Sequence, residues 1–151
     1  MNIKRVALAF ITAGLLPLAA HADLPGHHPG YLHALTDLRD ARWALEHRPG
    51  DAAVSRREDV AITEIDAAIR EAKVAAAEDG KNLAERPRSD AGADRPGRLH
   101  RAAELLQQAR RDVAQEEDNP QARVLRNRVV IHIDAAIRAT ESAIRAVELR
   151  R

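Results

Sequence analysis

Two arginines could form ion pairs with aspartates in the helices that follow them. Arg42 falls at the centre of the apolar stripe of a helix predicted over 31–47, and Arg110 takes the equivalent place later in the chain. Asp66 and Asp134 lie roughly 90° from the middle of the stripes of their own helices, at the border from which a carboxylate reaches a neighbour. We therefore predict the pairs Arg42–Asp66 and Arg110–Asp134, which would fix the register of packed helices.

The same arginines allow two other interpretations. Two guanidinium forks that converge on a carboxylate or a phosphate would form a small-anion site. Alternatively, long arginine side chains can bury their stems and hold their charged heads in water. All three interpretations remain open at this point.

Four histidines are candidate metal ligands, because neutral imidazole is the commonest ligand for Zn(II), Cu(II) and Ni(II). His27 and His28 are adjacent in a proline-rich stretch, while His33 and His100 each have a carboxylate four residues later on the same helical face. No His-Glu-x-x-His or Glu-x-x-His pattern accompanies them. The competing interpretation is that these are solvated histidines near helix starts.

Catalytic and cofactor motifs are missing from the sequence. The chain has no Cys, which excludes thiol chemistry, Cys-ligated zinc and covalent haem attachment. It also has no Gly-x-Ser-x-Gly motif and no glycine-rich phosphate loop. We therefore expect neither an enzyme nor a cofactor.

Residues 1–22 have the three parts of a secretory signal peptide. Lys4 and Arg5 precede an apolar run, and Ala20-His21-Ala22 forms a small-x-small cleavage site. The run is shorter than the ~20 apolar residues that span a bilayer, and no later stretch resembles a membrane span. We expect a mature chain from Asp23 that is periplasmic or secreted.

The mature chain has nearly balanced charge. Without Lys4 and Arg5 it holds 22 Lys and Arg against 23 Asp and Glu. The signs are interspersed, whereas a nucleic-acid-binding protein carries a concentrated basic face. We therefore expect no nucleic-acid partner.

A repeated hexapeptide organises the rest of the sequence. The residues 65–70, Ile-Asp-Ala-Ala-Ile-Arg, recur at 133–138, an offset of 68. Apolar residues at spacings of three and four surround both copies and predict two antiparallel helical hairpins, one over 31–79 and one over 98–150. Residues 23–30 form an extended leader and residues 80–97 a linker, because both stretches are rich in Pro and Gly.

The second helix of each hairpin has a recognisable start. Asp51 follows Pro49-Gly50 as an N-cap, and Asn119-Pro120 offers an N-cap followed by Pro at the first helical position. The last helix would be about 45 Å long and would extend past its shorter partner or bend.

The fold class that follows is all-α, a four-helix bundle built from two tandem hairpins in one domain. One hairpin exposes an apolar face, and two copies bury these faces against each other. The alternative is a pair of separate hairpins on a flexible tether, each pairing with another molecule.

The sequence resembles a family of small exported bacterial helical-hairpin proteins of uncharacterised function. The resemblance rests on Leu35-x-x-Leu38-Arg39-x-Ala41-Arg42 in the first helix and Ile65-Asp66-x-Ala68-Ile69-x-Glu71 in the second. The family's hairpin usually occurs once, but here it appears twice, with Gln107-Gln108 in place of Arg39-Asp40 in the second copy. The resemblance implies no activity.

These observations favour a structural or protein-interaction module, whose partner is another protein or a second copy of the chain. The alternative function is a small-anion or metal-binding helical bundle.

Overall fold

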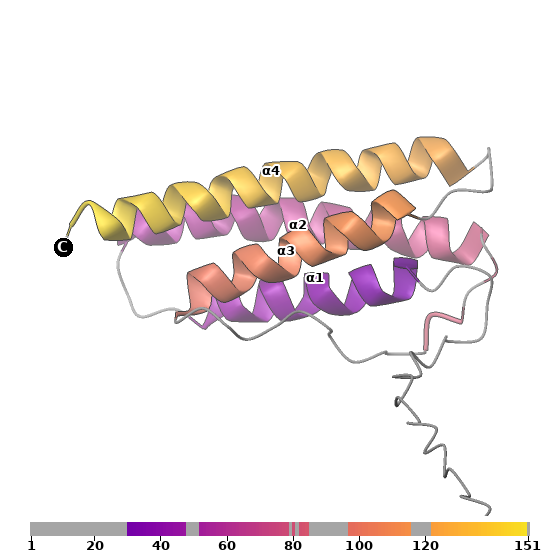
Figure 1. Cartoon of the computed structure of the whole chain (residues 1–151), viewed down its shortest axis with the longest axis horizontal. Coiled ribbons are helices and arrows are strands. Elements are labelled where there is room, and N and C mark those ends of the chain that lie inside the picture. Colours follow the sequence, from indigo (N-terminus) through magenta and orange to yellow (C-terminus); the bar gives the residue numbers. More distant parts are fainter. Residues whose placement is uncertain are drawn as a thin grey trace, which may run out of the picture.

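The computed structural model describes residues 30–47, 52–78, 80, 82–84, 97–115 and 122–150. These residues form four helices, α1 (Gly30–Glu46), α2 (Ala52–Glu78), α3 (Arg98–Gln115) and α4 (Ala122–Glu148), and contain no strand. The predicted all-α fold class is confirmed, and the helices lie side by side as a bundle (Figure 1).

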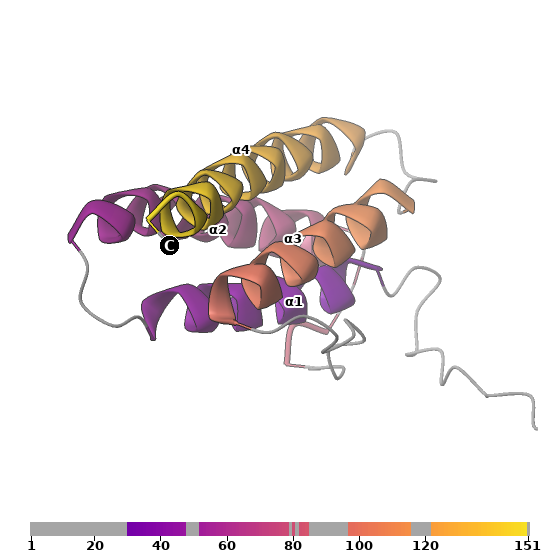
Figure 2. The ribbon, with the colours of Figure 1, turned by 60° about the vertical axis from the view of Figure 1, so that its left-hand side comes forward.

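The helices pack as two antiparallel hairpins laid against each other. Helix α1 contacts α2 and α3, and helix α4 contacts α3 and α2. In the part of the chain that the structure describes, the backbones of the two diagonal pairs, α1 with α4 and α2 with α3, do not come close to each other, and an ion pair links the side chains of Glu58 on α2 and Arg98 on α3. Equivalent helices run in opposite directions, α1 against α3 and α2 against α4 (Figures 1 and 2). The hairpins therefore bury their apolar faces against each other, rather than standing apart on a tether.

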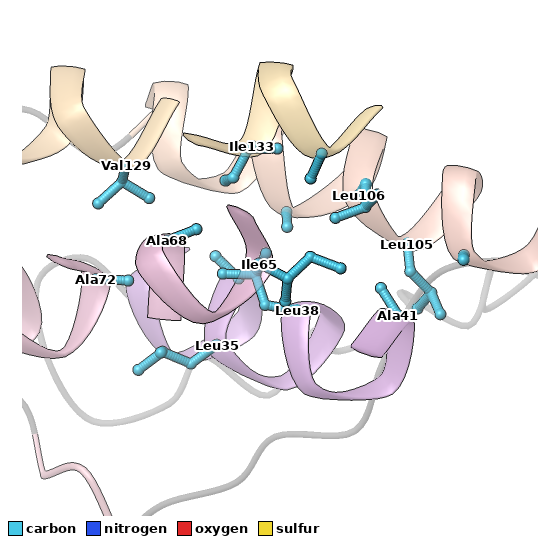
Figure 3. Packing of buried hydrophobic residues seen from close by; sticks show 14 of the residues in the cluster. Leu35, Leu38, Ala41, Ile65, Ala68, Ala72, Leu105, Leu106, Val129 and Ile133 are labelled. Carbon is cyan, nitrogen blue, oxygen red and sulfur yellow. The ribbon is translucent and has the colours of Figure 1, made fainter. Parts of the chain in front are cut away.

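The core is made of small and aliphatic side chains from all four helices (Figure 3). Leu38, Ile65, Leu106 and Ile133 are fully buried, one from each helix. Buried alanines lie between these larger residues and allow the helix backbones to approach closely. The fully buried alanines include Ala34, Ala41, Ala61, Ala68, Ala72, Ala75, Ala76, Ala102, Ala109, Ala136 and Ala143.

The second helix of each hairpin is longer than the first. Helices α2 and α4 have 27 residues each, about 40 Å of helix, whereas α1 has 17 and α3 has 18. The long helices extend past the short ones, as the sequence predicted, and their overhanging segments run alongside each other (Figure 1). None of the described helices is both long and apolar enough to cross a membrane.

Two glycines lie at helix boundaries with left-handed backbone angles. Gly80 has φ 71° just past the end of α2, and its N–H donates to the carbonyl of Ala77 at 3.0 Å. Gly97 has φ 101° immediately before α3. Both conformations are strained for residues with a Cβ.

The N-cap predictions at Asp51 and Asn119-Pro120, like the signal peptide over 1–22, lie outside the described residues.

Candidate functional site

Arg42 and Asp66 join the two helices of the first hairpin. Arg42 Nε donates to Asp66 Oδ1 at 2.7 Å, and Arg42 Nη1 lies 2.6 Å from Glu46 Oε1 one turn later on α1. The hydrogen bond to Asp66 raises the pKa of the Arg42 guanidinium above its ordinary value, and the neighbouring carboxylate charges add to this effect against a smaller opposing effect of burial. The guanidinium is therefore charged at any pH at which the fold is studied.

Arg110 and Asp134 form the equivalent pair in the second hairpin. Arg110 Nε donates to Asp134 Oδ1 at 2.5 Å. The hydrogen bond to Asp134 and its charge raise the pKa of Arg110, as in the first hairpin. Each arginine contacts the aspartate of its own hairpin, and no contact joins Arg42 to Arg110 among the described residues.

The predicted position of these arginines at the centre of the apolar stripe is wrong. The preceding alanines, Ala41 and Ala109, are fully buried and occupy the stripe. Because successive helical residues are turned by about 100°, the arginines then fall at its edge. Arg42 keeps 34% of its side chain exposed and Arg110 keeps 46%. Ion pairs that are this exposed to solvent contribute little to stability. Both guanidinium groups already bind a carboxylate of the protein. The geometry therefore favours a register role over an anion site.

The two histidine candidates that the structure describes, His33 and His100, belong to no group of possible metal ligands among the described residues. His27 and His28 lie outside the described residues. His33 is half-buried on α1, and His100 Nε2 lies 3.8 Å from Glu148 Oε1 near the end of α4. Within the described ranges, no three His, Asp or Glu side chains are grouped as metal ligands.

A buried ion pair that the sequence did not indicate links the two hairpins. Arg98, the first residue of α3, is paired with Glu58 of α2. Only 1% of the Glu58 side chain and 23% of the Arg98 side chain are exposed. Arg98 Nη1 also donates to the carbonyls of Ala44 and Leu45, at 3.5 and 3.3 Å, and so binds the C-terminal end of α1. One side chain thus holds three helices together.

A sequence signal for the Glu58 part of this pair was present. Glu58 precedes Ala61 by three residues and Ile65 by seven, so it lies on the buried face of α2. The apolar pattern in the sequence is centred on the repeat at 65–70, and this acidic residue lies two turns before it, outside the predicted stripe. Nothing local to Arg98 indicates its partner, which lies 40 residues earlier in the chain.

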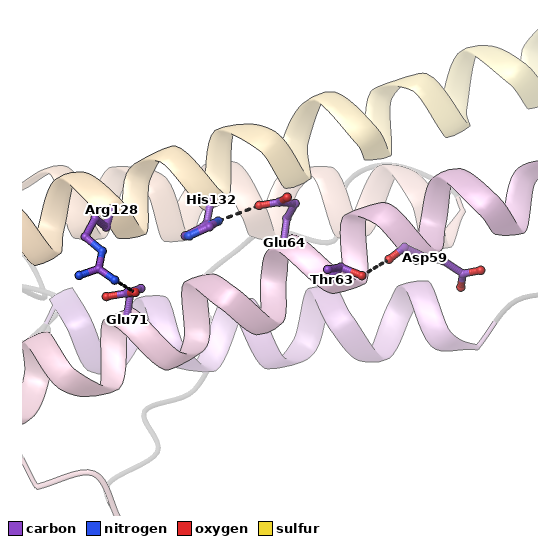
Figure 4. Close-up of polar contacts among 6 residues, drawn as sticks. All are labelled: Asp59, Thr63, Glu64, Glu71, Arg128 and His132. Atoms are coloured by element: carbon purple, nitrogen blue, oxygen red, sulfur yellow. Dashed lines mark hydrogen bonds and ion pairs between the residues drawn. The ribbon is translucent and has the colours of Figure 1, made fainter.

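Two further ion pairs cross between α2 and α4 (Figure 4). His132 Nδ1 lies 2.7 Å from Glu64 Oε2, and Arg128 is paired with Glu71. His132 has one third of its side chain exposed, so it lies at the edge of the core. Glu64 and His132 are 68 residues apart, so they occupy equivalent places in the two repeats.

The exposed face of α1 and α3 carries an open groove lined by Asp40, Trp43, Ala44, Arg101 and Leu105, hereafter the Trp43 groove. Its volume is about 290 Å³. Ala44 and Leu105 are nearly inaccessible, while Trp43 is 62% exposed and stacks on His47 with ring centroids 4.0 Å apart. The groove combines an apolar floor with an aromatic wall, a carboxylate and a guanidinium, a composition suited to side-chain recognition.

Comparison with known proteins yields no relative: no protein-family model, no curated protein and no solved structure matches the chain. The resemblance to exported helical-hairpin proteins therefore stays a prediction from the sequence.

Proposed function

We propose that the protein is an exported helical interaction module, not an enzyme, and that it holds a protein partner through the Trp43 groove. The observation that carries this proposal is the exposure of Trp43, the only tryptophan in the chain, at 62% beside a nearly buried apolar floor. Tryptophan is enriched among residues that dominate binding energy, because its large ring buries roughly 150–250 Å² on contact.

The size and chemistry of the groove limit its partner. A volume of about 290 Å³ is at the low end for small-molecule sites and holds one or two side chains. An aliphatic side chain of the partner would cover Leu105 and pack against the indole, and a basic group beside it would complement the Asp40 carboxylate. The partner is therefore a polypeptide with an aliphatic anchor next to Lys or Arg.

The segment over 1–22 supports export to the periplasm or beyond the cell. Removal of that segment would leave a chain beginning at Asp23, which intact-mass measurement of the protein from its native envelope would detect. A native protein that retains Met1 would contradict export by cleavage.

The single tryptophan gives a direct test of the groove. The chain labelled with 5-fluorotryptophan has one fluorine signal, from Trp43, and we expect native envelope extract to shift or broaden that signal. Captured partner should be reduced more than tenfold by Trp43→Ala, since truncation of a central anchor commonly costs over 2 kcal/mol, roughly thirtyfold in affinity. Val124→Ala, at a 65% exposed position on α4, is the control and should bind normally. Equal capture by both variants would refute the proposal.

A further inference from the structure

The two hairpins carry opposite net charge. The helices of the first hairpin, 30–46 and 52–78, hold nine acidic and six basic residues, a net charge of −3. The helices of the second hairpin, 98–115 and 122–148, hold nine basic and five acidic residues, a net charge of +4. The near neutrality of the whole chain conceals this difference between its halves.

Part of the charge difference lies at the interface between the hairpins. In three ion pairs that join described residues of the two hairpins, the acid belongs to the first and the base to the second. These pairs are Glu58 with Arg98, Glu64 with His132 and Glu71 with Arg128 (Figure 4 shows the last two). The carboxylate of Glu58 is almost fully buried, and Glu71 has only 18% of its side chain exposed.

Because the hairpins are repeats of each other, the residues that would face each other in a pairing of two identical hairpins can be derived from the sequence. Equivalent helices are antiparallel, and equivalent residues differ by 68 (Figure 2). In a pairing of two first hairpins, Glu64 would face another Glu64, and Glu71 would face Val60, the residue equivalent to Arg128.

The buried carboxylate adds a further penalty to such a pairing. Glu58 would face Gly30, the residue equivalent to Arg98, and would lose the Arg98 cation. Buried carboxylates that lose a cation, or that are opposed to each other, are strongly unfavourable. A pairing of two second hairpins would also oppose like residues, because His132 faces His132 and Arg98 faces Arg126, the residue equivalent to Glu58.

We propose that the face of the first hairpin formed by Glu58, Glu64 and Glu71 is a charge-coded recognition surface that fits the second hairpin of this chain, its own or that of a second copy, and rejects another first hairpin. A second copy of the chain can therefore join only by reciprocal exchange of hairpins. The 19 residues between Glu78 and Arg98 are long enough for either the closed or the exchanged form. This inference does not depend on the Trp43 groove.

Full-length charge variants test the code. The acidic variant carries Arg128→Glu and His132→Glu, and the basic variant carries Glu64→Arg and Glu71→Arg. Each variant places like charges across its own interface. The swapped variant combines all four substitutions and restores opposite charges with reversed polarity. We expect the acidic and basic variants to melt several degrees below the unmodified chain, and the swapped variant to recover most of that loss.

Mixing the acidic and basic variants gives the sharpest result. In a reciprocally exchanged heterodimer, both hairpin interfaces pair opposite charges. We expect light scattering to show this dimer with a dissociation constant about a hundredfold below that of either variant alone. A variant too unstable to fold alone should be recovered by refolding together with its complement. A mixture that stays monomeric, or a swapped variant that melts no higher than its two parents, would overturn the proposal.

Discussion

Among changes to the ion pairs, we expect the removal of Arg98 to lower the free energy of unfolding most. In Arg98→Met, the stem of the side chain stays, while the buried Glu58 carboxylate loses the Arg98 cation and the carbonyls of Ala44 and Leu45 lose a donor. Removing one partner of a buried pair costs about 3–5 kcal/mol. Because 23% of the Arg98 side chain is exposed, we take the lower end, about 3 kcal/mol. For roughly 100 ordered residues this corresponds to a fall of about 14 °C in melting temperature.

The assay is urea and thermal unfolding followed by circular dichroism at the helix band. Arg138→Met, at an exposed position on α4, is the matched control and should change stability by less than about 0.5 kcal/mol. The double variant Glu58→Met/Arg98→Met removes both charges and should be about 2 kcal/mol more stable than Arg98→Met alone, since the carboxylate that lost the Arg98 cation is no longer buried there. The reasoning is refuted if Arg98→Met lowers the free energy of unfolding no more than the control does. It is also refuted if the loss in the double variant equals the sum of the losses in Glu58→Met and Arg98→Met measured separately.

Three further outcomes follow from the same geometry. Asp66→Ala should cost at most about 1 kcal/mol in urea unfolding, and the cost should shrink as salt rises, because the bridge is partly exposed; a salt-insensitive loss above about 2 kcal/mol would mean that the pair is desolvated. Because the pKa of Arg42 is raised, its side chain stays charged at every pH below the ordinary arginine pKa, and the stability that this charge contributes is lost only as the pH rises above that pKa. The free-energy cost of Arg42→Gln should therefore stay constant between about pH 8 and 10, and a cost that declines over this range would contradict the prediction. Ile65→Ala should cost about 2–4 kcal/mol by thermal unfolding, whereas Ile131→Ala, at a 62% exposed position, should cost less than about 0.5 kcal/mol; equal costs would place the core elsewhere.

The helices and their pairing within each hairpin could be predicted because the signals are local. Apolar residues at spacings of three and four mark the buried faces, and the Pro-Gly stretches mark where helices stop. Asp66 and Asp134 could be placed at a helix border because a helical wheel depends only on their own segments. Each has an arginine of the same hairpin within hydrogen-bond distance.

The contacts between the hairpins could not be read from the sequence, because they depend on the register in which two helical faces meet. Arg98 reaches Glu58 across 40 residues, and His132 reaches Glu64 across 68. A shift of one turn would give each a different partner. The sequence predicts Arg42 at the wrong place on the helix because alanine is only weakly apolar, although Ala41 is the residue that is buried in the core. The exposure of Trp43 was equally hidden, since a tryptophan on a helix is as compatible with a core as with a surface.

Chemical cross-linking tests most directly that the two hairpins pack on each other within one chain. The chain has no Cys, so Glu64→Cys with His132→Cys introduces two thiols at residues that contact each other across α2 and α4. Trp43→Cys with His132→Cys is the control, because the backbones of α1 and α4 do not come close to each other among the described residues. In dilute solution, a short bismaleimide should link the first pair within a monomer and leave the control pair unlinked. Links that form only between chains, or equally for both pairs, would contradict the intramolecular four-helix bundle.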